Sequence, residues 1–233
     1  MKKIGLLFFI LALIVGVGLA NVLSFGKLTG GIFNYSISHS VSGSGNVASE
    51  KRDVSGFSAI EVGSVFQVEA TAGKDFGVEV EADDNLLPLI KTEVSDGGVL
   101  RLETEKGIST GNPILVRITA PHIENLEVSG ASKVFLDNIS NENLQIDASG
   151  AAKVAVAGKT ANLTVDVSGA SKIDAENLQS ENASVDASGA SSIKVFAAEQ
   201  LKAAASGASS VVYSGSPRNL TKKTSGASSI KEK

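Results

Sequence analysis

The chain has 233 residues, a net charge of -4 at pH 7, 42% hydrophobic residues and only 5% aromatic residues. This length and apolar content allow one substantial core or two small ones, and the weakly acidic balance, without a Lys/Arg-rich block, argues against nucleic-acid binding. Cysteine is absent, which excludes disulfides, thiolate metal sites, a cysteine nucleophile and an acylated lipoprotein cysteine.

Residues 1–26 predict export. Two lysines are followed by a long apolar run without charge, which is the layout of an export signal. Gly18 and Ala20 suit cleavage before Asn21, yet the run is also long enough to cross a bilayer. The sequence is compatible with two alternatives, a cleaved signal peptide and a retained membrane anchor. In either case we expect the protein in the periplasm or at the cell surface.

Residues 27–49 are dense in Gly and Ser without a sustained period, which is typical of a linker that merges into a first strand. The body of the protein is then predicted over residues 50–233, with irregular coils over 50–120 and regular repeats over 121–233. Strands with one buried face are expected where apolar and polar residues alternate, at residues 57–73, 76–82, 98–105 and 114–120.

One short helix is predicted within "DDNLLPLIKTEV" at residues 83–94. Asp83, Asp84 and Asn85 suit its N-terminal cap, and Pro88 suits its first turn. We expect one or two turns at most.

One seven-residue motif, represented by "ASGAAKV" at residues 148–154, recurs six times in the second half of the chain. The Ser-Gly-Ala segments begin 18 to 20 residues apart, at Ser129, Ser149, Ser168, Ser188, Ser206 and Ser225. A period of this length indicates a stacked solenoid. Two or three short strands per period, turned at Gly and Asn, predict an all-β parallel β-helix with coils of about 19 residues. A leucine-rich repeat would show a denser Leu pattern.

Aligning the copies gives each position in the coil a physical role. The Gly after the marker Ser predicts a corner, where a positive φ or a close backbone approach is needed. A β-branched column five residues after the marker predicts a core stack, made of Val134, Val154, Ile173, Ile193, Val211 and Ile230. An amide column six residues before the marker predicts a ladder of side-chain hydrogen bonds, made of Asn143, Asn162, Asn182, Gln200 and Asn219.

Two charged columns are the candidate contact surface. The acidic column consists of Glu127, Asp147, Asp166 and Asp186, and the basic column consists of Lys133, Lys153 and Lys172. Stacked carboxylates could suggest calcium, but the first three each have a lysine in their own coil, and the Gly-Gly-X-Gly-X-Asp repeat of calcium-binding β-rolls is absent. We therefore predict two opposed charge stripes on a solvated wall, with no metal and no cofactor.

Catalytic groups are scarce. The histidines are His39, in the predicted linker, and His122, where the repeats begin. Neither a histidine metal cluster nor a Ser-His-Asp set can be assembled from them, and no acid/base pair is apparent. The repeat aromatics, Phe135, Phe196 and Tyr213, are expected to pack against the coil. No enzymatic activity is predicted.

The segments "GSGNVASEKRDVSGFSAIEV" (43–62) and "VEVEADDNLLPLIKTEVSDGGVLRLETE" (78–105), followed by the Ser-Gly-Ala coils, resemble the putative auto-transporter adhesin family with its head GIN domain. The likeness spans roughly residues 43–231. It implies a right-handed parallel β-helix outside the cytoplasm and supplies no site residues.

Two classes of function follow from these features. The first is a non-enzymatic adhesin-like or scaffolding protein of the envelope, whose repetitive wall makes weak, multivalent contacts with glycans or surface proteins. The alternative is a carbohydrate-active enzyme or a specific carbohydrate-binding module acting on envelope polysaccharide. Self-association into a homo-oligomer is a further expectation, since a coil end offers unpaired strand edges.

Overall fold

A computed structural model describes residues 40–233. The predicted signal or anchor segment (1–26) and most of the predicted linker lie outside the described residues. Within residues 40–233, none of the helices has the length and apolar character needed to cross a membrane. The described chain is all-β apart from one 3-10 turn.

The elements in chain order are β1 (Val41–Ser42), β2 (Val47–Arg52), β3 (Ala59–Val62), β4 (Phe66–Ala72), β5 (Gly77–Asp83), η1 (Leu87–Leu89), β6 (Ile90–Val94), β7 (Val99–Thr104), β8 (Ile108–Ser109), β9 (Ile114–Ala120), β10 (Asn125–Val128), β11 (Lys133–Ala148), β12 (Lys153–Val167), β13 (Lys172–Ala187), β14 (Ser192–Phe196), β15 (Gln200–Ala205), β16 (Ser210–Ser214), β17 (Asn219–Thr224) and β18 (Ser229–Glu232).

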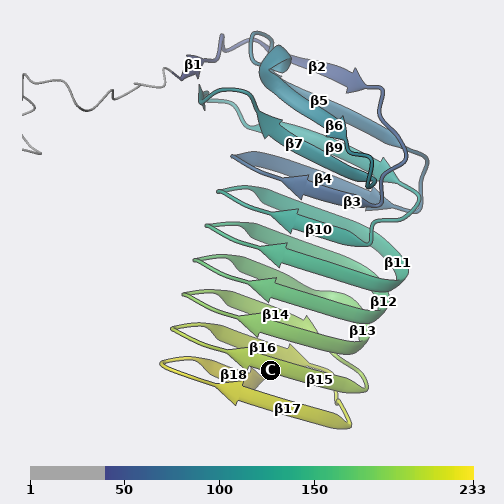
Figure 1. The fold of residues 1–233 in the computed structure, drawn as a ribbon, viewed down its shortest axis with the longest axis vertical. Helices are drawn as coiled ribbons and strands as arrows, with labels where there is room; N and C mark the ends of the chain where they lie inside the picture. The colour runs from purple at the N-terminus through teal and green to yellow at the C-terminus, as the bar shows by residue number, and fades with distance from the viewer. Residues whose placement is uncertain (1–39) are drawn as a thin grey trace, which may run out of the picture. The chain divides into compact units, whose positions relative to one another are not determined.

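The repeats form a stack of parallel coils, which confirms the predicted β-helix (Figure 1). Strands β11, β12 and β13 each run through most of a coil and pair in parallel with the next. Beyond β13 the coil is divided between two strands, because β14 and β15 both pair with β13. The stack then continues through β16 and β18 on one side and β17 on the other.

Each coil has three walls, defined here on β12. The first wall is the strand that leads into the Gly corner (residues 162–167), the second wall follows the previous corner (153–157), and the third wall is the short return between them (158–161). At the boundary between the second and third walls the pairing register shifts. The three walls enclose the core.

The glycine corners stack directly on one another. Six corner glycines, from Gly130 to Gly226, have φ between 71° and 75°, a region that residues with a Cβ rarely adopt. The backbone also passes close by, since the Ala170 N–H donates to the Gly150 carbonyl at 2.8 Å. Both predicted reasons for glycine therefore apply at the same position.

The N-terminal part continues two of the walls and then departs from the coil pattern. Strands β10, β3 and β7 extend the first wall in parallel, and β4 and β9 extend the second wall. Pairs β2–β5, β5–β9 and β6–β7 are antiparallel. Hairpin connections such as the turn at residues 95–98 produce antiparallel neighbours, so the predicted irregular half is a mixed sheet that covers this end of the stack.

The predicted core stack is confirmed for five of its six members. Val134, Val154, Ile173, Ile193 and Val211 are each no more than 3% exposed. Ile230, in the last coil, is only partly buried and packs against the core from the end. The aromatics are divided: Tyr213 is buried as predicted, but Phe135 is 49% exposed, because it points outward from the second wall.

The amide ladder is confirmed on the first wall for the first three of its five members, Asn143, Asn162 and Asn182. The side-chain amide nitrogen of Asn162 donates to the side-chain oxygen of Asn143 at 3.1 Å. The side-chain amide nitrogen of Asn182 donates to the side-chain oxygen of Asn162 at the same distance. Gln200 and Asn219 continue the column in register. The ladder joins neighbouring coils through side chains as well as backbone.

The predicted helix exists only as the single turn η1, and its predicted caps are wrong. The residue at its N-cap is Leu86, with no side-chain cap hydrogen bond. Asp83 instead accepts hydrogen bonds from Thr110 and Asn112, and Asn85 bonds to Ser42 and Ser44. These side chains attach the chain around β1 and β8 to the end of the stack. Strands β1 and β2 therefore occupy part of the segment predicted as linker.

Candidate functional site

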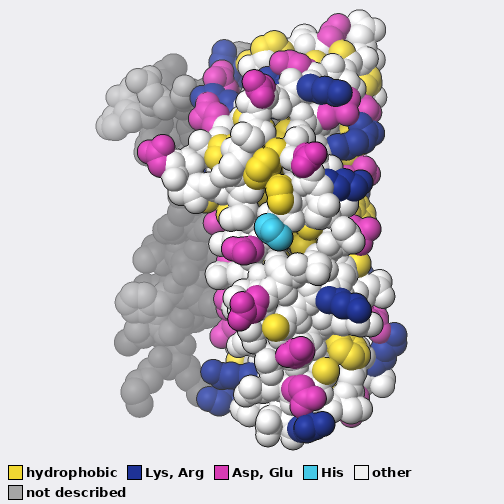
Figure 2. All heavy atoms as spheres, turned by 90° about the vertical axis from the view of Figure 1, so that its right-hand side faces the viewer, with side chains coloured by type: hydrophobic (Ala, Val, Ile, Leu, Met, Phe, Trp, Pro, Cys, Tyr) yellow, Lys and Arg dark blue, Asp and Glu magenta, His cyan; other side chains and the backbone are white. Residues whose placement is uncertain are grey.

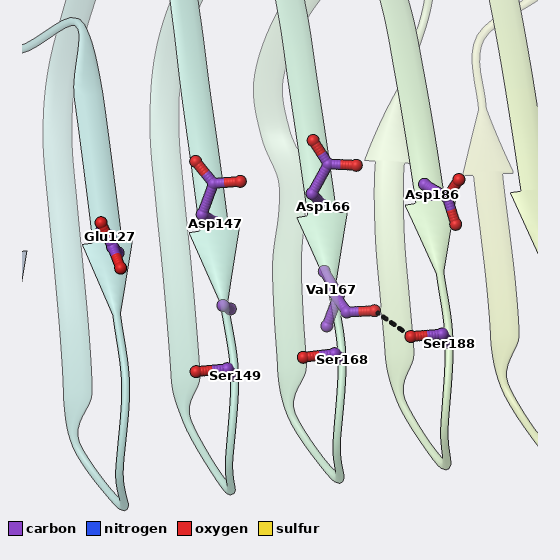
Figure 3. A pocket seen from close by; sticks show the side chains of 9 residues that line it. Glu127, Asp147, Ser149, Asp166, Val167, Ser168, Asp186 and Ser188 are labelled. Atoms are coloured by element: carbon purple, nitrogen blue, oxygen red, sulfur yellow. Dashed lines mark hydrogen bonds between the residues drawn. The ribbon is translucent and has the colours of Figure 1, made fainter.

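The four predicted carboxylates lie in one line on the first wall. Strand register places Glu127 beside Asp147, Asp147 beside Asp166, and Asp166 beside Asp186. Figure 3 shows them on neighbouring strands, with the corner serines Ser149, Ser168 and Ser188 in a second line closer to the turn. Together they line a shallow depression of about 270 Å³.

The acidic column extends beyond the repeats. Glu61 on β3 lies in register with Glu127, and Arg101 on β7 lies in register with Glu61. The Arg101 guanidinium bonds to the Glu61 carboxylate at 2.8 and 2.9 Å, so a cation closes this end of the column. Sequence reasoning missed both residues because β3 and β7 lack the Ser-Gly-Ala motif. The likeness of "AIEV" (59–62) to "NLEV" (125–128) is the signal that could have identified Glu61.

The acidic column is electrostatically strained at its centre. Burial raises the pKa of Asp166, and the neighbouring carboxylates Asp147 and Asp186 raise it further. Asp147 also accepts a hydrogen bond from the Gln145 amide at 2.8 Å. Like charges held at the coil spacing repel one another, and this repulsion adds to the effect of burial on the pKa of Asp166.

The basic column lies on the second wall, around the Gly corner from the acidic column. Lys133, Lys153 and Lys172 are exposed and in register. Within residues 40–233, none of these lysines forms an ion pair with the acidic column; the second wall's own pairs include Lys194 with Asp174 at 3.4 Å. The stripes are thus on two walls, and a lysine in the same coil does not neutralise its carboxylate.

The described part of the chain contains no set of three or more His, Asp or Glu side chains placed to hold one metal ion. His122 is exposed at the start of the repeats and lines a different hollow from the acidic column. The role of the two stripes as a contact surface, and the expectation of no bound metal or cofactor, stay predictions.

Replacing Asp166, at the centre of the acidic column, tests how much its ionised carboxylate destabilises the folded protein. The pKa of Asp166 is raised in the folded protein, so ionisation of this carboxyl disfavours the fold. The stabilising contribution of the protonated carboxyl is complete below the unfolded pKa and is lost as the pH rises through the folded pKa. Asp166→Asn should therefore raise the free energy of unfolding in urea at pH 7, by less than about 1 kcal/mol because the site is solvated. The gain should vanish near pH 3. Asp96→Asn, an exposed turn residue outside the column, is the control, and an equal gain there would contradict the explanation.

Comparison with known proteins agrees with the architecture. Residues 56–217 match the family described as "Putative auto-transporter adhesin, head GIN domain". The curated proteins include no match.

Three similar solved structures support the same fold. A putative adhesin from Bacteroides fragilis is 22% identical, with a TM-score of 0.68 over 83% of this chain and 100% of that one. A putative lipid binding protein from Parabacteroides distasonis is 18% identical, with a TM-score of 0.54 over 84% and 100%. A putative adhesin from the same organism is 20% identical, with a TM-score of 0.50 over 84% and 100%. At these identities the likeness shows the fold alone.

Proposed function

The chain belongs to the family described as "Putative auto-transporter adhesin, head GIN domain", and from this membership we propose that it is a non-enzymatic adhesin-like or scaffolding protein of the cell envelope. It makes weak, multivalent contacts with glycans or surface proteins through its repetitive walls. Residues 1–26 direct its export to the periplasm or the cell surface and, if retained, attach it to the membrane.

The observation that carries the proposal is the register of the outward columns. Glu127, Asp147 and Asp166 are adjacent in one column, and Lys133, Lys153 and Lys172 are adjacent in another. Each coil therefore repeats the same group at the strand spacing of about 4.8 Å. Such an array favours many equivalent weak contacts over one tight site, and the total affinity then comes from their number.

The proposal is tested by varying the density of the protein on a surface. Beads carrying the purified protein at increasing density should bind bacterial surfaces with apparent affinity that rises about 100-fold or more, because multivalent contacts multiply. Asp147→Asn together with Asp166→Asn should weaken this rise, whereas Asp96→Asn should not. Tight binding that is independent of density, or turnover of a polysaccharide by the purified protein, would contradict the proposal.

A further inference from the structure

The third wall carries a chain of hollows that the charge stripes do not include. One hollow of about 560 Å³ lies along the return segments of four coils, and Ser140, Lys159, Gln179 and Ala198 line it in sequence. The first three of these lie in register. Small side chains at Ala161 and Ala198 leave the space open. This hollow is therefore elongated along the stacking direction.

The hollow continues toward the N-terminal end of the stack. Ser140 and Asn141 also line a second hollow, of about 240 Å³, with His122. That hollow shares Gly73 and Pro121 with a third, of about 480 Å³. Together these residues form a continuous trough. Figure 2 faces this side of the molecule.

A fourth hollow lies beyond Asp75, on strands β5 and β9 beside the second wall. It has a volume of about 610 Å³ and is lined by Phe76, Arg117 and Thr119, among others. The Thr119 hydroxyl donates to the Asp75 carbonyl at 2.7 Å, so a residue that lines the fourth hollow contacts one that lines the third. Phe76 is 38% exposed, and the partly buried Phe196 lines the other end of the trough. The trough and the neighbouring fourth hollow therefore each contain one aromatic side chain.

The lining groups define the chemistry of an occupant. Amides and hydroxyls predominate in the middle of the trough, and the charges along it balance: the cations are Lys74 and Lys159, and the anions are Asp75 and Glu181. A balanced charge gives no preference for a polyanion or a polycation. Amides and hydroxyls pair with hydroxyl groups, and exposed aromatic faces pack against apolar ring surfaces.

One buried atom in the trough lacks a hydrogen-bond donor. Asn141 lies where two hollows meet; its amide nitrogen donates to the Ile123 carbonyl at 2.9 Å, but its carbonyl oxygen is buried without a partner among the described residues. A buried acceptor without a donor destabilises the protein, because it has lost its hydrogen bonds to water. A small turn of this side chain toward an incoming hydroxyl would remove that destabilisation.

An extended peptide fits this wall less well. Peptides that bind to sheets pair their backbone with a free strand edge, and the third-wall segments of β11, β12 and β13 are already paired with one another. Recognition here must come from side chains. A trough that runs along several coils also suits a ligand that is itself a long chain.

We propose that the third-wall trough binds a neutral polysaccharide chain laid along the long axis of the solenoid. This inference rests on the proposed adhesive function and adds a glycan contact on the third wall to the contacts of the charge stripes.

Binding to neutral hexasaccharides of glucose, mannose and galactose tests the assignment with the purified full-length protein. At least one of these should bind about tenfold or more tighter than its monosaccharide, because only a chain fills the trough. The trough variant, His122→Ala with Lys159→Ala and Gln179→Ala, should bind about tenfold more weakly. All three side chains are exposed, so folding should be unchanged, which the urea midpoint verifies.

The matched control is Gln145→Ala with Lys202→Ala and Thr164→Ala, three exposed residues on the first wall, which should bind like the unchanged protein. No binding of any hexasaccharide, equal binding of the monosaccharide, or a loss confined to the control variant would overturn the inference. If beads still bind bacterial surfaces in a density-dependent way while no hexasaccharide binds, the adhesive function stands and the trough assignment fails.

Discussion

Gly169→Ala should destabilise the protein by about 2–5 kcal/mol. The left-handed conformation at φ = 72° costs a residue with a Cβ about 1–2 kcal/mol. The new Cβ would also stand 2.5 Å from the Gly150 carbonyl oxygen and 3.0 Å from its nitrogen. These are backbone atoms of the preceding coil, which can yield only if the coils separate, and overpacking of this kind adds about 1–3 kcal/mol. Urea unfolding of the purified protein measures the loss in the free energy of unfolding.

Gly56→Ala is the matched control, because it shares the strain without the collision. Gly56 has φ = 78°, and a Cβ there meets nothing within 4 Å. Its loss should stay near the 1–2 kcal/mol of backbone strain alone. Equal losses in the two variants would show that contact between stacked corners contributes nothing.

Leu163→Ala should cost about 2–5 kcal/mol, the range for truncating a buried leucine. Leu163 is 1% exposed and stacks in register between Leu144 and Ala183. Since the next coil already presents an alanine, the cavity would have a small side chain on one side and could not be filled by a neighbour. Unfolding in urea gives the size of the effect.

Thr164→Ala is the control for this substitution. Thr164 is the adjacent residue on the same strand and points outward, so its removal should change the free energy of unfolding by less than about 0.5 kcal/mol. A large loss at Thr164, or a small one at Leu163, would contradict the assignment of inward and outward columns.

The repeat half could be predicted from sequence because a fixed period converts each position into a column. The inward role of Ile173, the corner role of Gly169 and the ladder role of Asn162 all follow from alignment of the copies, and the structure confirms them. The half before residue 121 has no such period. There the pairing of β2 with β5 and the attachment of β1 through Asn85 depend on contacts between distant residues, which local patterns do not encode.

The candidate site was predicted in part for the same reason. Column alignment gives the order of Asp147, Asp166 and Asp186, but not the angle between walls, so it placed the lysine stripe opposite the acidic stripe on one wall. The trough escaped prediction because its lining combines loop residues such as Pro121 with third-wall residues such as Gln179. Those positions are where the coil length varies and the alignment is least regular.

The backbone hydrogen bonds between stacked corners, such as that from Ala170 to Gly150, have a mechanical consequence. They join one coil to the next along the direction in which the coils stack (Figure 1). Tension between an anchored end and a bound surface would therefore peel the stack from one end, a coil at a time. Each coil of about 19 residues would release roughly 60 Å of extended chain. A tether of this kind would lengthen in steps under load, and the coils that remain folded would stay bound to the surface.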